Sequence, residues 1–172
     1  SWAQYAVAGP NARRLLQKVV DPSFDISNKA FPFMGCANIT VCGGLRARLF
    51  RISFSGELAF EIAVPTRYGD AMMRRLMKEG EEFDVTPYGT EALGVMRIEK
   101  GHATGNELNG TTTALNLGMG GMVSKKKDSI GSTLSERVGL NPEDALKLVG
   151  FRPVDYKDPV PAGSHLMTKG DP

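Results

Sequence analysis

The sequence predicts an α+β domain, in which an antiparallel sheet packs against helices, followed by the start of a β-rich C-terminal barrel. Three observations support this fold class. Strand patterns joined by short turns follow one another between residues 39 and 64, helix-start signals come at residues 66 and 86, and strand patterns return near the end. With 172 residues, the chain is long enough for one domain or one and a fraction.

The first elements are a short buried strand and a helix. Tyr5 to Ala8 has the apolar character of a buried strand. A helix begins after it, because a proline such as Pro10 loses no hydrogen bond at the first helical position. The dipeptide Asp21-Pro22 ends this helix. The apolar stripe of the helix is formed by Leu15, Leu16 and Val19.

Three strands joined by tight turns form the centre of the predicted sheet. The first strand is Ile39 to Cys42, and the Gly43-Gly44 pair after it is typical of a hairpin turn. Leu45 to Ser53 returns beside the first strand and alternates apolar with charged residues. Ser55 to Glu57 then turns the chain into a third strand, Leu58 to Val64. Consecutive strands with such short connections form an antiparallel meander.

The third strand carries one acid on a face of small residues. Alternation places the large apolar side chains on one face, and these are Leu58, Phe60, Ile62 and Val64. The opposite face holds Glu61 between Ala59 and Ala63. An acid with space beside it suits a ligand that donates hydrogen bonds, whereas a glutamate that simply points to water is the alternative. The residues of this strand leave both interpretations open.

Two further helices follow the third strand. Thr66 is a suitable N-cap for a helix from about Arg67 to Glu79. The inner side of this helix is formed by Tyr68, Ala71, Met72 and Leu76. Thr86-Pro87 repeats the start signal for a helix that runs to about Lys100 and is closed by Gly101. The second helix is apolar around much of its girth, so we expect it to be buried between layers.

The last part of the chain predicts a loop and then a second module. Residues 101–128 are rich in Gly, Thr and Asn, which is typical of a functional or covering loop when it is this long. A helix start at Asn141 to Asp144 leads into a strand from Leu146 to Pro153. We therefore divide the chain into a main domain, residues 1–140, and the start of a C-terminal β-barrel domain, residues 141–172.

Composition argues against several function classes. The net charge is +2, and the longest basic run, Lys125 to Lys127, is too short for the concentrated basic face that nucleic-acid binding requires. Cys36 and Cys42 lie far in sequence from the two histidines, so we expect no metal site and a small buried thiol at each cysteine. No apolar run reaches transmembrane length and no signal peptide is recognisable, which favours the cytoplasm and no membrane partner.

Several motifs run in a fixed order through most of the chain. They are AVAGPNARRLL, RISFSGELAFEIAVP, PYGTEALGVMRIEKG, GNELNGTTTALNLGMG and KKKDSIG. Together they resemble the aminomethyltransferase family of folate-binding proteins, which includes the glycine-cleavage T-protein. The resemblance implies that residues 1–140 are part of a three-part fold around a central folate pocket, with the N-terminal part of that fold preceding Ser1 and the final barrel cut short.

Within this family, YGTEALGVMRIEKGH and NGTTTALNLG are most similar to the C-terminal part of the α subunit of heterotetrameric sarcosine oxidases. The resemblance implies a parent enzyme that oxidises sarcosine at a flavin and passes the one-carbon unit to tetrahydrofolate, giving 5,10-methylenetetrahydrofolate. It also implies FAD, FMN and NAD in other parts of the complex and the other oxidase subunits as partners. A glycine-cleavage aminomethyltransferase and a non-catalytic folate-binding or assembly module are the alternatives.

Two site residues follow from the resemblance. The pterin-binding glutamate of the family falls on Glu61, in agreement with the strand argument. Phe54 falls where several relatives have a tyrosine beside the pterin, so it can pack on the ring but cannot donate a hydrogen bond. Leu93 falls where the glycine-cleavage enzyme has an arginine, which argues against that enzyme. The family's aspartate near the reactive folate nitrogen precedes Ser1, so we expect no catalytic residue in this chain and no activity of the isolated fragment.

Overall fold

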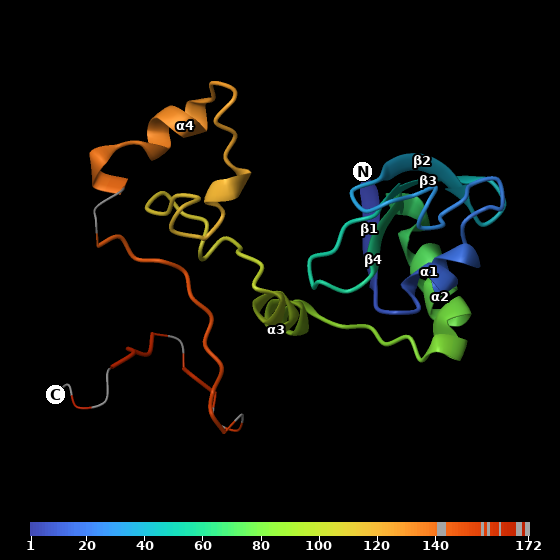
Figure 1. The fold of residues 1–172 in the computed structure, drawn as a ribbon. Coiled ribbons are helices and arrows are strands. Elements are labelled where there is room, and N and C mark those ends of the chain that lie inside the picture. The colour runs from blue at the N-terminus through green and yellow to red at the C-terminus, as the bar shows by residue number, and fades with distance from the viewer. Residues whose placement is uncertain (141–143, 156, 158, 162, 168–169, 171–172) are drawn as a thin grey trace. The chain divides into compact units, whose positions relative to one another are not determined.

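The computed structural model describes residues 1–140, 144–155, 157, 159–161, 163–167 and 170. The strands are β1 (Trp2–Ala8), β2 (Cys36–Val41), β3 (Leu45–Phe50) and β4 (Ala59–Pro65) (Figure 1). The α-helices are α1 (Ala12–Gln17), α2 (Gly69–Gly80), α3 (Thr90–Lys100) and α4 (Ile130–Ser135). The chain divides into two compact units, Ser1–His102 and Ala103–Pro172, and each is described by itself.

The four strands form one antiparallel sheet in the order β1-β4-β3-β2. The predicted meander of β2, β3 and β4 is therefore confirmed, and β1 extends it by pairing with the free side of β4. The register places Ala6 and Phe50 beside Glu61 on the two neighbouring strands. Glu61 thus lies in the interior of the sheet, on a strand with a partner on each side.

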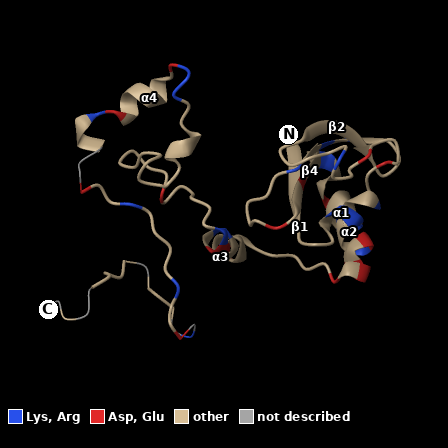
Figure 2. Ribbon diagram, in the orientation of Figure 1, with Lys and Arg blue, Asp and Glu red and all other residues tan. Residues whose placement is uncertain are grey.

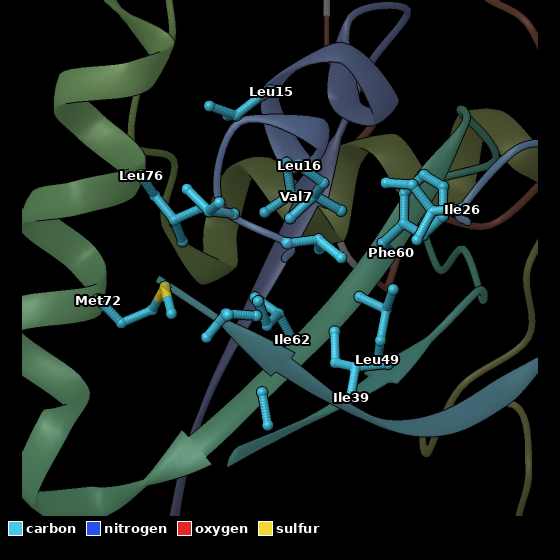
Figure 3. Close-up of a cluster of buried hydrophobic side chains, with 14 of the residues drawn as sticks. Val7, Leu15, Leu16, Ile26, Ile39, Leu49, Phe60, Ile62, Met72 and Leu76 are labelled. Carbon is cyan, nitrogen blue, oxygen red and sulfur yellow. The ribbon is translucent and has the colours of Figure 1, made fainter. Parts of the chain in front are cut away.

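One face of the sheet packs against α1 and α2 to form the hydrophobic core (Figure 3). The core contains residues from all four strands and both helices, and its largest fully buried side chains are Phe60, Leu16, Leu49, Ile62, Met72, Val19, Val41 and Val64. The predicted stripe of α1 is confirmed, because Leu15 and Leu16 are buried. On α2, Met72 and Leu76 are buried as predicted, whereas Ala71 is exposed.

The start of α2 differs from the prediction. Thr66–Tyr68 forms a 3-10 turn, and the α-helix begins only at Gly69. No side chain caps either the turn or the helix, so the prediction of Thr66 as the N-cap is wrong. Gly69 permits a close approach of α2 to β1, because a Cβ at this position would lie 2.9 Å from the Cβ of Ala3. Packing against the sheet, rather than a cap, therefore sets where this helix begins.

α3 is shorter and more exposed than the sequence predicts. It begins at Thr90, after residues 85–89 without regular structure. It ends as predicted at Gly101, whose φ of 74° is a left-handed conformation that glycine adopts without steric cost. No residue of α3 is buried and Ile98 is 65% exposed, so the prediction of a helix buried between layers is wrong for this chain. An apolar helix surface indicates that a helix can be buried, but does not say which element covers it.

The described part of the second unit contains little regular structure. Residues 103–128 form the predicted loop, which contains one 3-10 turn at Gly120–Met122. α4 begins with a capping box, in which Ser129 and Ser132 satisfy each other's backbone N–H groups. Among the described residues, no helix combines the length and apolar character that crossing a membrane requires.

The C-terminal strand expected from Leu146 to Pro153 is not formed. The described residues 144–155 contain no strand, and Asn141 to Glu143 of the expected helix start lie outside the described residues. The described residues of this unit contain no strand that could pair with this segment. Its hydrogen bonds go to Asn116 instead, whose Nδ2 donates to the carbonyl of Leu146 at 3.0 Å and whose backbone carbonyl accepts from the N–H of Leu148 at 2.7 Å. The loop thus takes hydrogen bonds that a neighbouring strand would otherwise supply.

Candidate functional site

Glu61 lies on the face of β4 that points away from the hydrophobic core. Its neighbours on this face are Ala59 and Ala63, as the alternation predicts, and the Glu61 side chain is half-buried. The side-chain amide of Gln4, on β1, donates a hydrogen bond to Oε2 of Glu61. Glu61 makes no ion pair with any described residue. The Glu61 carboxyl group is therefore not tied up in an ion pair, and its neighbours along β4 on this face are small side chains.

Glu61 and Phe54 line the same pocket. The pocket has a volume of about 220 Å³. Its lining residues come from β1, the β3–β4 connection, β4 and the start of α3, and they are Ala6, Ala8, Ile52, Phe54, Ser55, Ala59, Glu61, Tyr88 and Leu93. Three alanines from two adjacent strands form a floor without protruding side chains. The structure thus brings together the two residues that the sequence singled out, although seven positions separate them in the chain.

Phe54 is held at the pocket by the connection between β3 and β4. The Oγ of Ser53 accepts a hydrogen bond from the N–H of Gly56 at 2.8 Å, which closes the turn around Phe54. The ring of Phe54 packs on the imidazole of His102, with 4.9 Å between ring centroids and 48° between planes. Phe54 remains 37% exposed, so part of its ring surface is free for a further contact.

Tyr88 is a pocket residue that the sequence reasoning missed. It precedes α3 and lines the pocket together with alanines of β1 and β4. Partial burial raises the pKa of the Tyr88 phenol, and the negative charges of Glu57 and Glu61 raise it further. The hydroxyl therefore stays protonated at neutral pH and can donate a hydrogen bond. Tyr88 directly follows Thr86-Pro87, and no sequence pattern indicates that this segment lies near β4. The sequence therefore did not identify Tyr88 as a pocket residue.

A larger pocket adjoins the first. It has a volume of about 480 Å³ and shares four lining residues with the smaller one, namely Ala6, Ala8, Tyr88 and Leu93. Gln4 also lines it, together with apolar side chains of α2 and of the segment after it, such as Met73, Met77 and Phe83. Because the two pockets share these lining residues, there is space beside β1 that connects the pocket at Glu61 with the larger pocket.

Other predicted features do not form a site. The Lys125 to Lys127 run precedes α4 as a short patch of positive charge, whereas basic and acidic residues are mixed along α2 (Figure 2). Cys36 and Cys42 are free and exposed, so the expectation of small buried thiols is wrong. Within the described part of the chain, no group of three or more His, Cys, Asp or Glu side chains has a geometry that could hold a metal ion.

The fold is an α+β domain, and one of its pockets is lined by a carboxylate, that of Glu61. A family model, described as "GCVT N-terminal domain", matches residues 1–127. This chain therefore belongs to the GCVT N-terminal domain family. The match confirms the family resemblance seen in the sequence motifs.

Named relatives point to a narrower group. The chain is 49% identical over 171 residues to "Sarcosine oxidase subunit alpha" of Rhizobium meliloti (strain 1021), covering 98% of this chain and 17% of that protein. It is 34% identical to "Dimethylglycine dehydrogenase, mitochondrial" of Mus musculus, over 77% of this chain and 15% of that protein. It is 31% identical to "Aminomethyltransferase" of Thermoanaerobacter sp. (strain X514), over 89% of this chain and 41% of that protein. The chain thus spans well under two thirds of each of these relatives.

Proposed function

We propose that this chain is the tetrahydrofolate-binding portion of a sarcosine oxidase α-type subunit. In the parent enzyme, the one-carbon unit from sarcosine oxidation is transferred to tetrahydrofolate, giving 5,10-methylenetetrahydrofolate. The observation that carries the proposal is the pocket in which Glu61 and Phe54 meet over a floor of alanines. The GCVT family match and the similarity to sarcosine oxidase α subunits support it.

The chemistry of the pocket suits a pterin ring. A pterin presents its ring N–H and its 2-amino group as adjacent donors, and a carboxylate such as that of Glu61 accepts both in a fork. The alanine floor leaves a flat surface for a planar ring, and Phe54 supplies an aromatic wall. The volume of about 220 Å³ lies below the usual range for drug-sized ligands. We therefore assign the pocket to the ring system, with the remainder of the folate outside it.

The remaining parts of the reaction belong to the rest of the parent protein. We propose that FAD, FMN and NAD bind in other parts of the complex, that the catalytic residue lies outside this chain, and that the other oxidase subunits are its partners. We also propose a cytoplasmic location. In this proposal, residues 1–140 form the folate-binding domain and residues 141–172 belong to a separate C-terminal β-barrel domain.

A glycine-cleavage aminomethyltransferase is the second candidate, favoured by the 31% identity to an aminomethyltransferase over 89% of this chain. Leu93 argues against it, because an apolar side chain lines the pocket where that enzyme is expected to place an arginine. A non-catalytic folate-binding or assembly module is a third. The sequence that flanks this chain separates the candidates: dinucleotide-binding motifs upstream favour the oxidase, whereas a short parent protein without them favours the transferase.

Calorimetric titration of tetrahydrofolate under reducing conditions tests the proposal. We expect the chain to bind, and Glu61→Ala to weaken the affinity by about tenfold or more, which is the loss expected when a charge-assisted hydrogen-bonded pair is removed. Glu57→Ala is the matched control, since Glu57 is an exposed acid of the adjacent turn that does not line the pocket.

Two results would contradict the proposal. Equal affinities of the unmodified chain and Glu61→Ala would remove Glu61 from the binding site. Absence of binding to both would show that this chain does not carry a competent pocket. A separate assay addresses activity: one-carbon transfer or sarcosine oxidation by this chain alone, without partner subunits, would refute the assignment of catalysis to other parts of the parent protein.

A further inference from the structure

Gln4 stands next to Glu61 across the β1–β4 pair. The register pairs Gln4 with Ala63 and Ala6 with Glu61, so Gln4 is diagonal to Glu61 on the same face of the sheet. From this position the Nε2 of Gln4 donates to the Oε2 of Glu61. The two residues are 57 positions apart in the chain, so only the pairing of β1 with β4 brings them together.

The structure shows no buried contact that depends on the Gln4 amide. Gln4 is exposed, and its bond to Glu61 is the one side-chain hydrogen bond that it makes within the fully described residues 1–102. It covers none of the hydrophobic core, which lies on the other face of the sheet. Gln4 bonds no backbone group with its side chain and fills no buried gap, so its cross-strand pair with Glu61 is the contact through which it acts.

The bond does have a consequence for the carboxylate. A glutamate side chain loses rotamer freedom when it is fixed, and fixing it before a ligand arrives lowers the cost of binding. The amide of Gln4 occupies one lone-pair site of Oε2, and a carboxylate offers about four such sites. Both oxygens of Glu61 therefore remain able to accept from a ligand.

The neutrality of Gln4 matters as well. A lysine or arginine at this position would also fix the carboxylate, but it would form an ion pair that a ligand must compete with. The Gln4 amide fixes the acid while leaving its negative charge uncompensated. Arg48 is a cation on the same face, diagonal to Glu61 across the β3–β4 pair, but it lies over the ring of Trp2 and makes no ion pair with Glu61.

We infer that Gln4 is a positioning residue, whose amide holds the Glu61 carboxylate in the orientation that receives the donors of the bound ring. The inference rests on the proposed function, because it assigns a role within the same site. Gln4 itself is not expected to contact the ring, since it does not line the smaller pocket.

Binding measurements on four variants of the full 172-residue chain test the inference. Gln4→Met keeps the length of the side chain and removes the donor, and we expect tetrahydrofolate to bind about threefold to tenfold more weakly. Gln17→Met is the matched control, because Gln17 is the only other glutamine and is exposed on α1. Glu61→Ala measures how far the affinity falls when the acid itself is removed. The double variant, Gln4→Met with Glu61→Ala, should bind no more weakly than Glu61→Ala alone, because Gln4 acts through Glu61.

A spectroscopic signature tests the contact without any ligand. In the free chain, we expect the side-chain amide resonances of Gln4 to shift on Glu61→Ala, while those of Gln17 stay in place. This dependence reports the Gln4–Glu61 contact, and the binding measurements then distinguish a positioning role from a merely structural one. Unchanged Gln4 resonances would overturn the inference whatever the binding data show.

The binding outcomes separate failure of the inference from failure of the proposed function. Unchanged or tighter binding by Gln4→Met, with weakened binding by Glu61→Ala, overturns the inference and leaves the proposed function standing. Further weakening by Gln4→Met in the Glu61→Ala background also overturns it, because Gln4 would then act independently. Equal binding by Glu61→Ala and the unmodified chain overturns the proposed function and the inference with it.

Discussion

The two faces of β4 differ in how completely other parts of the chain cover them. On the core face, Phe60, Ile62 and Val64 are each 0% exposed beneath α1 and α2. On the opposite face, Ala59 and Ala63 are buried but Glu61 is only half-buried and opens into a pocket. The same strand therefore has fully buried core side chains on one face and a partly accessible acid on the other.

The face with the acid is itself divided in two. At one end, the guanidinium of Arg48 lies 4.1 Å from the ring centroid of Trp2, so these two side chains cover the sheet. At the other end, Ala6 and Ala8 leave the pocket open beside Glu61. Small side chains, rather than polar ones, therefore leave the open space beside Glu61. Four substitutions probe this difference, and they follow in order of their expected effect on stability.

Phe60→Ala should have the largest effect on stability, because it opens a cavity in the hydrophobic core beneath β4. Phe60 stacks on Phe31 with 6.4 Å between ring centroids, and Arg13 lies 5.2 Å from its ring centroid. We expect the free energy of unfolding to fall by about 3–5 kcal/mol. Denaturant unfolding monitored by circular dichroism measures this change in the free energy of unfolding. A loss below about 1 kcal/mol would show that this face is less tightly packed than the structure indicates.

Gly56→Ala should have the next largest effect, because it strains the turn that holds Phe54. Gly56 has a φ of 94°, and a Cβ there would lie 2.6 Å from Cδ of Lys100. We expect a loss of about 1–3 kcal/mol of stability and weaker tetrahydrofolate binding. Gly94→Ala is the control, since a Cβ at Gly94 meets nothing within 4 Å and alanine favours the helix. If Gly56→Ala and Gly94→Ala had equal free energies of unfolding, alanine at position 56 would not strain the turn.

Asp21→Asn should produce a smaller effect that depends on pH. The Thr40 hydroxyl, together with the N–H groups of Gly43 and Gly44, holds the pKa of the Asp21 carboxyl below its ordinary value. Because the folded-state pKa is depressed, this stabilisation is complete above the unfolded pKa of about 4 and is lost as the pH falls through the folded pKa.

We therefore expect the Tm of Asp21→Asn to lie below that of the unmodified chain at pH 7, and the difference to shrink as the pH falls below about 4. Thermal melts across this pH range measure it. A constant difference at all pH values would contradict the role of the Asp21 charge. Tetrahydrofolate binding at pH 7 should stay unchanged, because Asp21 lies at the β2–β3 hairpin and does not line the pocket.

Ala6→Leu should have the smallest effect on stability but a clear effect on binding. Ala6 is exposed and lines the pocket, so a leucine here fills the space without overpacking the core. We expect the free energy of unfolding to change by no more than about 0.5 kcal/mol. Calorimetry should show that tetrahydrofolate binding is lost or strongly weakened. Normal binding by Ala6→Leu would mean that the ligand does not occupy this pocket.

Much of the sheet could be predicted from the sequence because its signals are local. The Gly43-Gly44 turn has two positive φ angles, and alternation in β4 correctly separates the core face from the acid. The α1 stripe was predictable for the same reason, since helical periodicity depends only on nearby residues. The family motifs then singled out Glu61 and Phe54, which line one pocket in the structure.

The errors arose where a distant segment decides the outcome. α2 begins at Gly69 because of the close approach to β1, which overrides the cap signal of Thr66. The strand expected from Leu146 was replaced by hydrogen bonds to Asn116, thirty positions away. Propensity describes what a segment can do by itself, and tertiary partners decide between its options.

By itself, the sequence determined which side chains of β4 face the core, that one acid stands among alanines, and to which family the motifs belong. Only the tertiary structure decided what stands beside that acid. Gln4 reaches Glu61 because β1 pairs with β4, and Tyr88 reaches the pocket because the segment before α3 returns to the sheet. The physical reason is that strand alternation is fixed by the geometry of neighbouring peptide units, whereas a site needs contacts between residues that the chain brings together only on folding.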